Sequence, residues 1–160
     1  QVINSNQPNF ISGITNTFSY KGLSLMVLFN VRQGGYSANP ILNPGTNFYY
    51  SANILNVPYW MPDNPINTHP ALNYPNPLGY GFYQNRSFAR LQDISIAYDL
   101  PQAFLDLLKM KSAKVYVSGK NLITWTEWNG WDPEFGVGGR DPGNNGPLLK
   151  TYTVGLNIQL

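Results

Sequence analysis

The sequence predicts an all-β fold of antiparallel strands joined by long, ordered loops, and three observations support this. First, apolar and polar residues alternate with a period of two in several segments. Second, 14% of the residues are aromatic, and 15 Gly and 13 Pro supply turns, a composition that favours strands over a helical bundle. Third, only 11% of the residues are charged, against roughly 25% in soluble globular domains. We therefore expect that some strand faces do not meet water.

Five segments have the strand pattern. From Leu23 to Val31 every second residue is apolar, and the same alternation runs from Tyr152 to Leu160. Similar alternation, less regular in the first segment, occurs in the remaining three. The five predicted strands are residues 10–20, 23–32, 87–100, 113–124 and 148–160. Most of them have at least the roughly 9 to 11 residues that a tilted strand needs to cross a bilayer.

The connections between these strands alternate between short and long. Lys21 and Gly22 form a tight hairpin turn, and residues 101–112 are enough for one or two turns of helix. Pro101 suits a first helical position. The expected apolar face of this helix consists of Phe104, Leu105, Leu107 and Leu108. The other two connections, residues 33–86 and 125–147, are long loops. Short turns on one side and long loops on the other are typical of outer-membrane barrels.

Two folds accommodate strands with one apolar face. In a soluble β-sandwich the apolar face packs on a second sheet, whereas in a membrane barrel it meets lipid. The low charge favours the barrel. A barrel exposes the side chains of Leu25, Val27, Ile96, Val154 and Ile158, whereas a sandwich buries them. Because the smallest single-chain barrels have about eight strands, we expect this chain to be the C-terminal part of a longer protein.

Several functions are disfavoured by composition. The formal net charge is +2 and the basic residues are scattered, so nucleic acid is not an expected partner. The chain has no Cys and one His, which removes thiolate and multi-histidine metal sites. The sequence has no run of about 20 apolar residues, so it predicts no membrane helix. We expect no metal, no cofactor and no enzymatic activity.

Specific motifs resemble a known family. Ser87–Pro101 (SFARLQDISIAYDLP) is similar to the SFLRLKNITLGYTLP segment of SusC/RagA-type TonB-dependent outer-membrane transporters. Val115–Thr126 (VYVSGKNLITWT) resembles the family's VYVSGQNLFTWT, and Gly130–Glu134 (GWDPE) resembles its GYDPE. Lys150–Asn157 (KTYTVGLN) is similar to RTYTFGLN, and Gly13–Gly22 resembles the preceding hairpin. The motifs follow the family's order over nearly the whole chain.

The resemblance implies that this chain supplies the last five strands of a barrel of about 22, with long extracellular loops, in the outer membrane of a Gram-negative bacterium of the Bacteroidota type. The family imports oligosaccharides or peptides. It works with an N-terminal plug, which is absent from this chain, a SusD-like surface lipoprotein and the TonB complex. Four residues match the terminal signal read by the barrel-assembly machinery, with Leu in place of the frequent final Phe: Thr153, Gly155, Ile158 and Leu160.

Loop aromatics are the candidate ligand contacts, because sugar rings stack their C–H faces on indole and phenol rings. The residues proposed to contact a glycan are Tyr59, Trp60, Tyr80, Trp128 and Trp131. The alternative is that they form loop core or an interfacial aromatic girdle. Trp125, at a strand end, is assigned to the girdle, and His69 is treated as an ordinary loop residue. The rival function is a soluble β-sandwich carbohydrate-binding module.

Four acidic residues lie in the second long loop: Glu127, Asp132, Glu134 and Asp141. Paired carboxylates hydrolyse glycosides in some enzymes, and oxygen-rich loops bind calcium. Here two of the acids are in Asp-Pro pairs, which are typical of turns, and the spacing is not that of an EF-hand. We therefore assign the four acids to loop structure, with calcium binding as the open alternative.

Overall fold

The chain forms two compact units in a computed structural model. The described residues are 5–39, 58–75, 77, 82–130, 132–134 and 148–160. The sheet unit comprises residues 8–33, 87–126 and 148–160, and the loop unit comprises residues 1–7, 34–86 and 127–147. None of the helices among the described residues has the length and apolar character needed to span a membrane.

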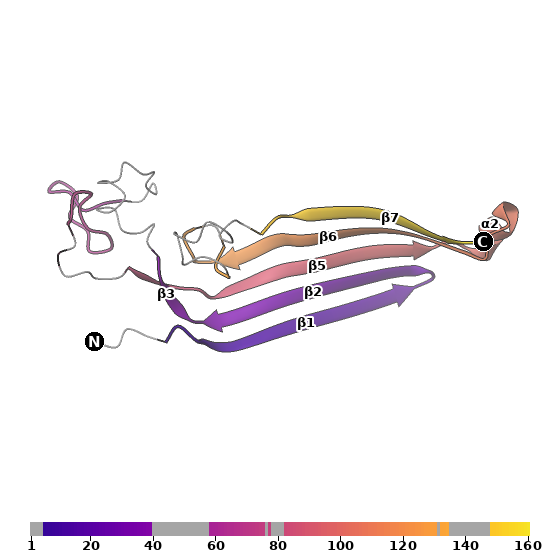
Figure 1. Cartoon of the computed structure of the whole chain (residues 1–160), viewed down its shortest axis with the longest axis horizontal. Coiled ribbons are helices and arrows are strands. Elements are labelled where there is room, and N and C mark those ends of the chain that lie inside the picture. Colours follow the sequence, from indigo (N-terminus) through magenta and orange to yellow (C-terminus); the bar gives the residue numbers. More distant parts are fainter. Residues whose placement is uncertain (1–4, 40–57, 76, 78–81, 131, 135–147) are drawn as a thin grey trace. The chain divides into compact units, whose positions relative to one another are not determined.

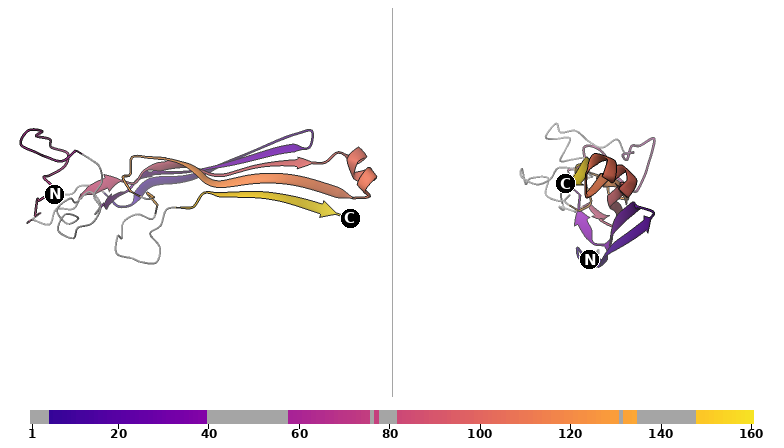
Figure 2. Two further views of the ribbon diagram at one scale, coloured as in Figure 1. Left: turned by 90° about the horizontal axis from the view of Figure 1, so that it is seen from above. Right: turned by 90° about the vertical axis from the view of Figure 1, so that its right-hand side faces the viewer.

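The sheet unit contains one five-stranded sheet (Figure 1). Its strands are β1 (Pro8–Tyr20), β2 (Leu23–Gly34), β5 (Phe88–Asp99), β6 (Ser112–Thr126) and β7 (Thr151–Gln159), in the order β1-β2-β5-β6-β7. The pairs β2–β5, β5–β6 and β6–β7 are antiparallel. Figure 2 shows these strands from above as one twisted layer. The prediction of an all-β, antiparallel fold is confirmed.

The short connections have the local geometry that their sequences favour. Lys21 and Gly22 both have positive φ, 46° and 82°, as the tightest hairpin turns require. Helix α2 (Gln102–Leu108) follows Pro101, which is the N-cap and not the first helical residue as predicted. Proline fits either place because its fixed φ is compatible with both. Of the predicted apolar face of α2, Leu105 alone is buried.

One face of the sheet is apolar on four neighbouring strands. The cross-strand register aligns Leu25, Ile96, Val117 and Val154 in one row across β2, β5, β6 and β7. The same register defines the whole apolar face: Leu23, Leu25, Val27, Phe29, Val31, Ala89, Leu91, Ile94, Ile96, Tyr98, Val115, Val117, Ile123, Trp125, Tyr152, Val154, Leu156 and Ile158. The bulge at Gln92 keeps the two halves of β5 on this face.

The apolar face has no second sheet on it among the described residues of the sheet unit. Ile96 is 49% exposed, Val154 75% and Ile158 49%, while Leu25 and Val27 are half-buried. None of these five diagnostic side chains is buried, so the sandwich alternative, which requires their burial, is not supported.

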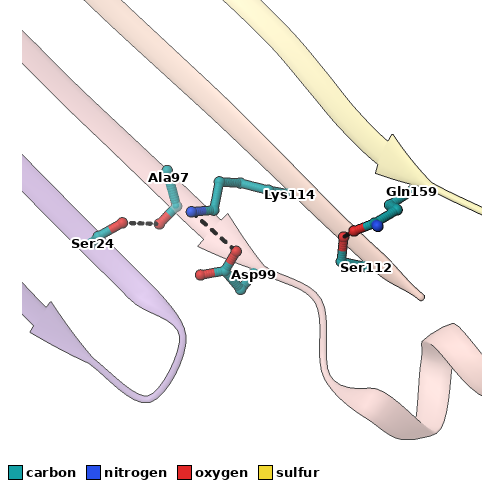
Figure 3. A network of polar contacts seen from close by, with 6 residues as sticks. All are labelled: Ser24, Ala97, Asp99, Ser112, Lys114 and Gln159. Atoms are coloured by element: carbon teal, nitrogen blue, oxygen red, sulfur yellow. Dashed lines mark hydrogen bonds and ion pairs between the residues drawn. The ribbon is translucent and has the colours of Figure 1, made fainter. Parts of the chain in front are cut away.

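The opposite face carries polar side chains that pair across the strands. Lys114 Nζ lies 3.3 Å from Asp99 Oδ1, and Ser24 Oγ donates to the Ala97 carbonyl at 3.4 Å (Figure 3). Further along the sheet, Lys120 Nζ lies 3.9 Å from Asp93 Oδ2. At least one partner of each ion pair is substantially exposed, so each pair contributes little stability. Their distribution defines a hydrated face.

Arg90 is the one charged side chain of β5 that is almost fully buried, with 2% exposure. Its Nε donates to Thr124 Oγ1 at 3.0 Å, and its guanidinium carbon lies 4.7 Å from the centre of the Phe88 ring. Both contacts are to neighbouring strand positions on the polar face. Burial of a charge is expensive unless it is hydrogen-bonded, and these contacts meet part of that need. The sequence pattern did not predict this burial.

The loop unit contains a second, two-stranded sheet that was not predicted. Strands β3 (Tyr36–Ala38) and β4 (Tyr83–Asn85) pair antiparallel. Both fall in residues 33–86, which the sequence assigned to loop. Three residues are too few to show a period-two pattern, which explains the miss. In the sheet unit, β6 extends to Thr126 and β7 begins only at Thr151, so the borders of the predicted second loop also move.

Candidate functional site

Gln84, on β4, connects the two long loops through side-chain hydrogen bonds. Its Oε1 accepts from Asn39 Nδ2 at 3.0 Å and from the Asn129 backbone N–H at 3.1 Å. Its Nε2 donates to the Glu127 carbonyl at 2.7 Å. Asn39 Nδ2 also donates to the Asn129 carbonyl. A segment from residues 127–129 is thereby attached to β4, far away in sequence.

Arg86 makes a second connection between the same loops. Its Nε donates to the Pro133 carbonyl at 2.7 Å, and one terminal nitrogen donates to the Glu134 carbonyl at 2.6 Å. Asp132 Oδ1 accepts the Glu134 backbone N–H at 2.8 Å, which fixes the turn. We call Gln84, Arg86, Asn39 and their partners the loop clamp. Asn39 and Asp132 are buried, with 1% and 5% exposure, so the clamp is internal to the loop unit.

Removing the Gln84 side chain is expected to loosen the clamp. Gln84→Ala loses three hydrogen bonds and deprives the buried Asn39 amide of a partner, which costs roughly 1–3 kcal/mol. Hydrogen exchange of the intact protein, followed by mass spectrometry, should show faster exchange in residues 127–130. Tyr83→Ala changes a 49% exposed neighbour on the same strand and serves as the control. Equal protection in both variants would contradict the clamp.

A pocket of about 330 Å³ lies within the loop unit. Its lining combines aromatic, aliphatic and polar side chains from residues 60–74 and from Phe82. The lining residues are Trp60, Ile66, Asn67, Thr68, His69, Pro70, Tyr74 and Phe82. Two local turns shape the segment: Met61 and Asn64 pair through both backbone groups, and the Tyr74 N–H donates to the Ala71 carbonyl at 3.0 Å. Apolar walls with a few polar groups are typical of small-ligand sites.

His69, predicted from the sequence to be an ordinary loop residue, lines the pocket. Its ring meets the Tyr59 ring edge to face, with centroids 6.5 Å apart. Its Nδ1 lies 3.2 Å from Thr68 Oγ1. Partial burial raises the pKa of the Tyr59 hydroxyl. No local sequence signal distinguishes His69, because the pocket depends on how residues 58–75 fold back on themselves.

The five predicted ligand-contact residues have different positions. Trp60 lines the pocket and is 41% exposed. Tyr59 does not line the pocket, but its ring contacts that of His69, which does. Trp128 is 7% exposed, so its burial favours the alternative that it is loop core. Tyr80 and Trp131 lie outside the described residues. Sequence reasoning did not single out Tyr74 and Phe82, although both belong to the aromatic-rich loop from which Trp60 was chosen.

The acidic residues of the second loop have structural contacts. Asp132 caps the turn at Glu134, and the backbone carbonyls of Glu127 and Glu134 accept clamp hydrogen bonds. Asp141 lies outside the described residues. Within the described part of the chain, no three His, Cys, Asp or Glu side chains lie where they would jointly hold a metal ion.

Comparisons with known proteins give one consistent result. The sequence matches no protein-family model. It is 31% identical to TonB-dependent receptor P3 of Formosa agariphila over 99% of this chain and 17% of the receptor. It is 29% identical to TonB-dependent receptor P26 of the same organism, over 98% of this chain and 17% of that receptor. The chain thus spans less than a fifth of these relatives.

Comparison with solved structures gives the same result as comparison with the curated relatives. The RagAB peptide importer in its 'open-open' state matches with a TM-score of 0.71 and 27% identity, over 98% of this chain and 18% of the importer chain. In the 'closed-closed' state the TM-score is 0.75 and the identity 25%, over 100% of this chain and 18% of the importer chain. The chain is homologous to a segment of SusC/RagA-type TonB-dependent transporters. The resemblance drawn from the motifs is confirmed.

The four residues of the predicted assembly signal lie in or directly after β7. Thr153 and Gly155 are on the polar face, since the register pairs them with Ser118 and Tyr116. Ile158 is on the apolar face, and Leu160 follows the strand with 78% exposure. Their role in assembly stays a prediction.

Proposed function

We propose that this chain forms part of the wall and extracellular loops of an outer-membrane TonB-dependent transporter that imports oligosaccharides or peptides. The observation that carries the proposal is the apolar face, whose large side chains are exposed or half-buried on four neighbouring strands of a sheet homologous to transporter barrels. Lipid is the partner that such a face fits. The hydrated face then lines the barrel interior, and residues 33–86 and 125–147 are on the extracellular side.

The remaining parts of the transport system are also proposals. The rest of the barrel, of about 22 strands, and an N-terminal plug complete the channel. A SusD-like lipoprotein covers the extracellular mouth, and the TonB complex supplies energy through the plug. The barrel-assembly machinery inserts the protein, with Thr153, Gly155, Ile158 and Leu160 as the recognised signal. The cell envelope is that of a Gram-negative bacterium of the Bacteroidota type.

Uptake measurements test the transporter. Cells with and without the full-length gene take up a labelled oligosaccharide mixture or a labelled peptide mixture, each too large for simple porins. We expect one mixture to enter only when the gene is present, and its entry to stop when TonB is deleted. Uptake that is the same with and without the gene would contradict the proposed function.

The pocket at Trp60 is the proposed cargo contact on this chain. In the full-length transporter, Trp60→Ala removes the exposed indole and should weaken binding of the imported cargo about tenfold or more, as truncation of an aromatic anchor typically does. Calorimetry on the purified transporter with its lipoprotein measures this affinity. Met61→Ala is the matched control, because Met61 is adjacent, 48% exposed and outside the pocket. If the two variants bind the cargo with equal affinity, Trp60 does not contact it and has a structural role only.

A further inference from the structure

Helix α2 exposes three large apolar side chains. Phe104 is 47% exposed, Leu107 78% and Leu108 45%. These three side chains make up much of the surface of a seven-residue helix. A short helix surrounded by water would not be expected to expose an apolar patch of this kind. The exposed apolar side chains therefore call for a partner.

The helix is amphipathic. At 100° per residue, Phe104, Leu107 and Leu108 share one side. The opposite side carries Gln102 and Asp106, whose side chains are joined by a hydrogen bond of 2.8 Å from Nε2 to Oδ1. An apolar side beside a hydrogen-bonded polar side is the pattern of helices that lie in a membrane interface.

The position of α2 connects this side to the apolar face of the sheet. The helix contacts β6. Leu105 of α2 and Ala113, near the start of β6, are buried, with 5% and 6% exposure. Ala113 pairs with Ile158, and two residues on, Val115 pairs with Leu156, so Ala113 belongs to the apolar side of the strand. The helix thus contacts the strand whose apolar side begins at Ala113. Figure 1 shows α2 at the same end of the sheet as the β1–β2 turn.

Two lysines follow the helix directly. Lys109 ends it in the left-handed conformation, with φ 55°, and Lys111 precedes β6. Both are exposed, and neither forms a salt bridge with another residue of the described chain. Long lysine side chains can keep their charge at the membrane surface while their stems lie along apolar surface. Phosphate groups of phospholipids are the complementary charges.

We propose that α2 lies in the headgroup region of the membrane leaflet on the short-turn side of the barrel. Phe104, Leu107 and Leu108 enter the acyl boundary there, and Lys109 and Lys111 bind phospholipid phosphate. This inference rests on the proposed function, which places the short connections on the periplasmic side. The helix thereby anchors the end of the β5–β6 pair in the membrane.

Spin labels test the anchor. This chain contains no cysteine. Single nitroxide labels are introduced at Leu107→Cys, Asp106→Cys and Val154→Cys in a full-length transporter from which any other cysteine has been removed. The protein is reconstituted in vesicles of phosphatidylethanolamine and phosphatidylglycerol. The measured quantity is the ratio of collisions with oxygen, which concentrates in lipid, to collisions with a water-soluble nickel chelate. We expect a ratio several-fold higher at residue 107 than at residue 106, with residue 154 as the lipid-exposed reference.

The three labels separate the possible failures. A lipid-like ratio at residue 154 with water-like ratios at both 106 and 107 would overturn the anchor and leave the proposed function intact. A water-like ratio at residue 154 would overturn the proposed function itself. Lys109→Glu combined with Lys111→Glu should lower the ratio at residue 107. An unchanged ratio would overturn the phosphate contact.

Discussion

Ile96→Arg in the full-length transporter is expected to destabilise the barrel. A cation on the lipid face costs about 2–4 kcal/mol at the bilayer midplane and about 0–1 kcal/mol near the interfaces, and we expect an intermediate cost because Ile96 lies three residues before the end of β5. Ile96 is in the central strand β5, on the apolar face, between Leu25 and Val117. Its side chain is 49% exposed, so the substituted Arg meets lipid and not a protein partner. The temperature at which the folded, fast-migrating form is lost in gel electrophoresis measures the effect.

Ser95→Arg is the matched control for this substitution. Ser95 is adjacent in sequence but on the hydrated face, where it pairs with Met26 and Ser118. An Arg there points into the barrel interior and lies two residues from Asp93. We expect a change within roughly 0.5 kcal/mol, as at ordinary surface positions. If the two variants were equally stable, the assignment of the two faces would be wrong.

Gly155→Ala is expected to destabilise the β6–β7 pair. Gly155 pairs with Tyr116, and the phenol ring covers the glycine so closely that an added Cβ would overlap Cζ, Oη and Cε1 of that ring. The ring must turn away from the strand, and forced repacking of this kind costs roughly 1–3 kcal/mol. The same gel assay measures the loss, and the amount of barrel in the outer membrane reports on assembly.

Two further variants show whether the Tyr116 ring is the cause. Gly13→Ala adds the same methyl group on β1, where nothing lies within 4 Å of the new atom, so we expect little change. Tyr116→Ala removes the ring, and in that background Gly155→Ala should cost much less than it does alone, which is coupling in a double-mutant cycle. If Gly155→Ala costs as much stability in the Tyr116→Ala background as it does alone, the Tyr116 ring is not the cause. The effect of Gly155→Ala would then belong to the assembly signal.

The sheet was predictable because each strand is indicated by the alternation of apolar and polar residues along its own sequence. Alternation from Leu23 to Val31 and from Tyr152 to Leu160 identified the apolar face, since a strand places every second side chain on the same side. The Lys21-Gly22 turn was likewise evident, because its geometry favours a residue such as Gly at positive φ. The family motifs added the order of the strands.

Other features depend on contacts between residues distant in sequence. The loop clamp joins Gln84 and Arg86 to residues 127–134. No sequence pattern in either loop predicts its contact with the other. The contact of the Tyr116 ring with Gly155 depends on the register of β6 and β7. The pocket is formed where residues 60–74 and Phe82 meet, so His69 could not be assigned to it from its neighbours. Period-two patterns need several residues, which is why β3 and β4 were missed.

The central claim is that the apolar face of this sheet meets lipid and the opposite face does not. The most direct test is a nitroxide scan from Asp93 to Tyr98 in the full-length transporter in lipid vesicles, with oxygen and nickel-chelate accessibility measured at each position. We expect a period of two, with high oxygen ratios at residues 94, 96 and 98 and low ratios at 93, 95 and 97. Uniform accessibility along β5, or high ratios at the odd positions, would contradict it.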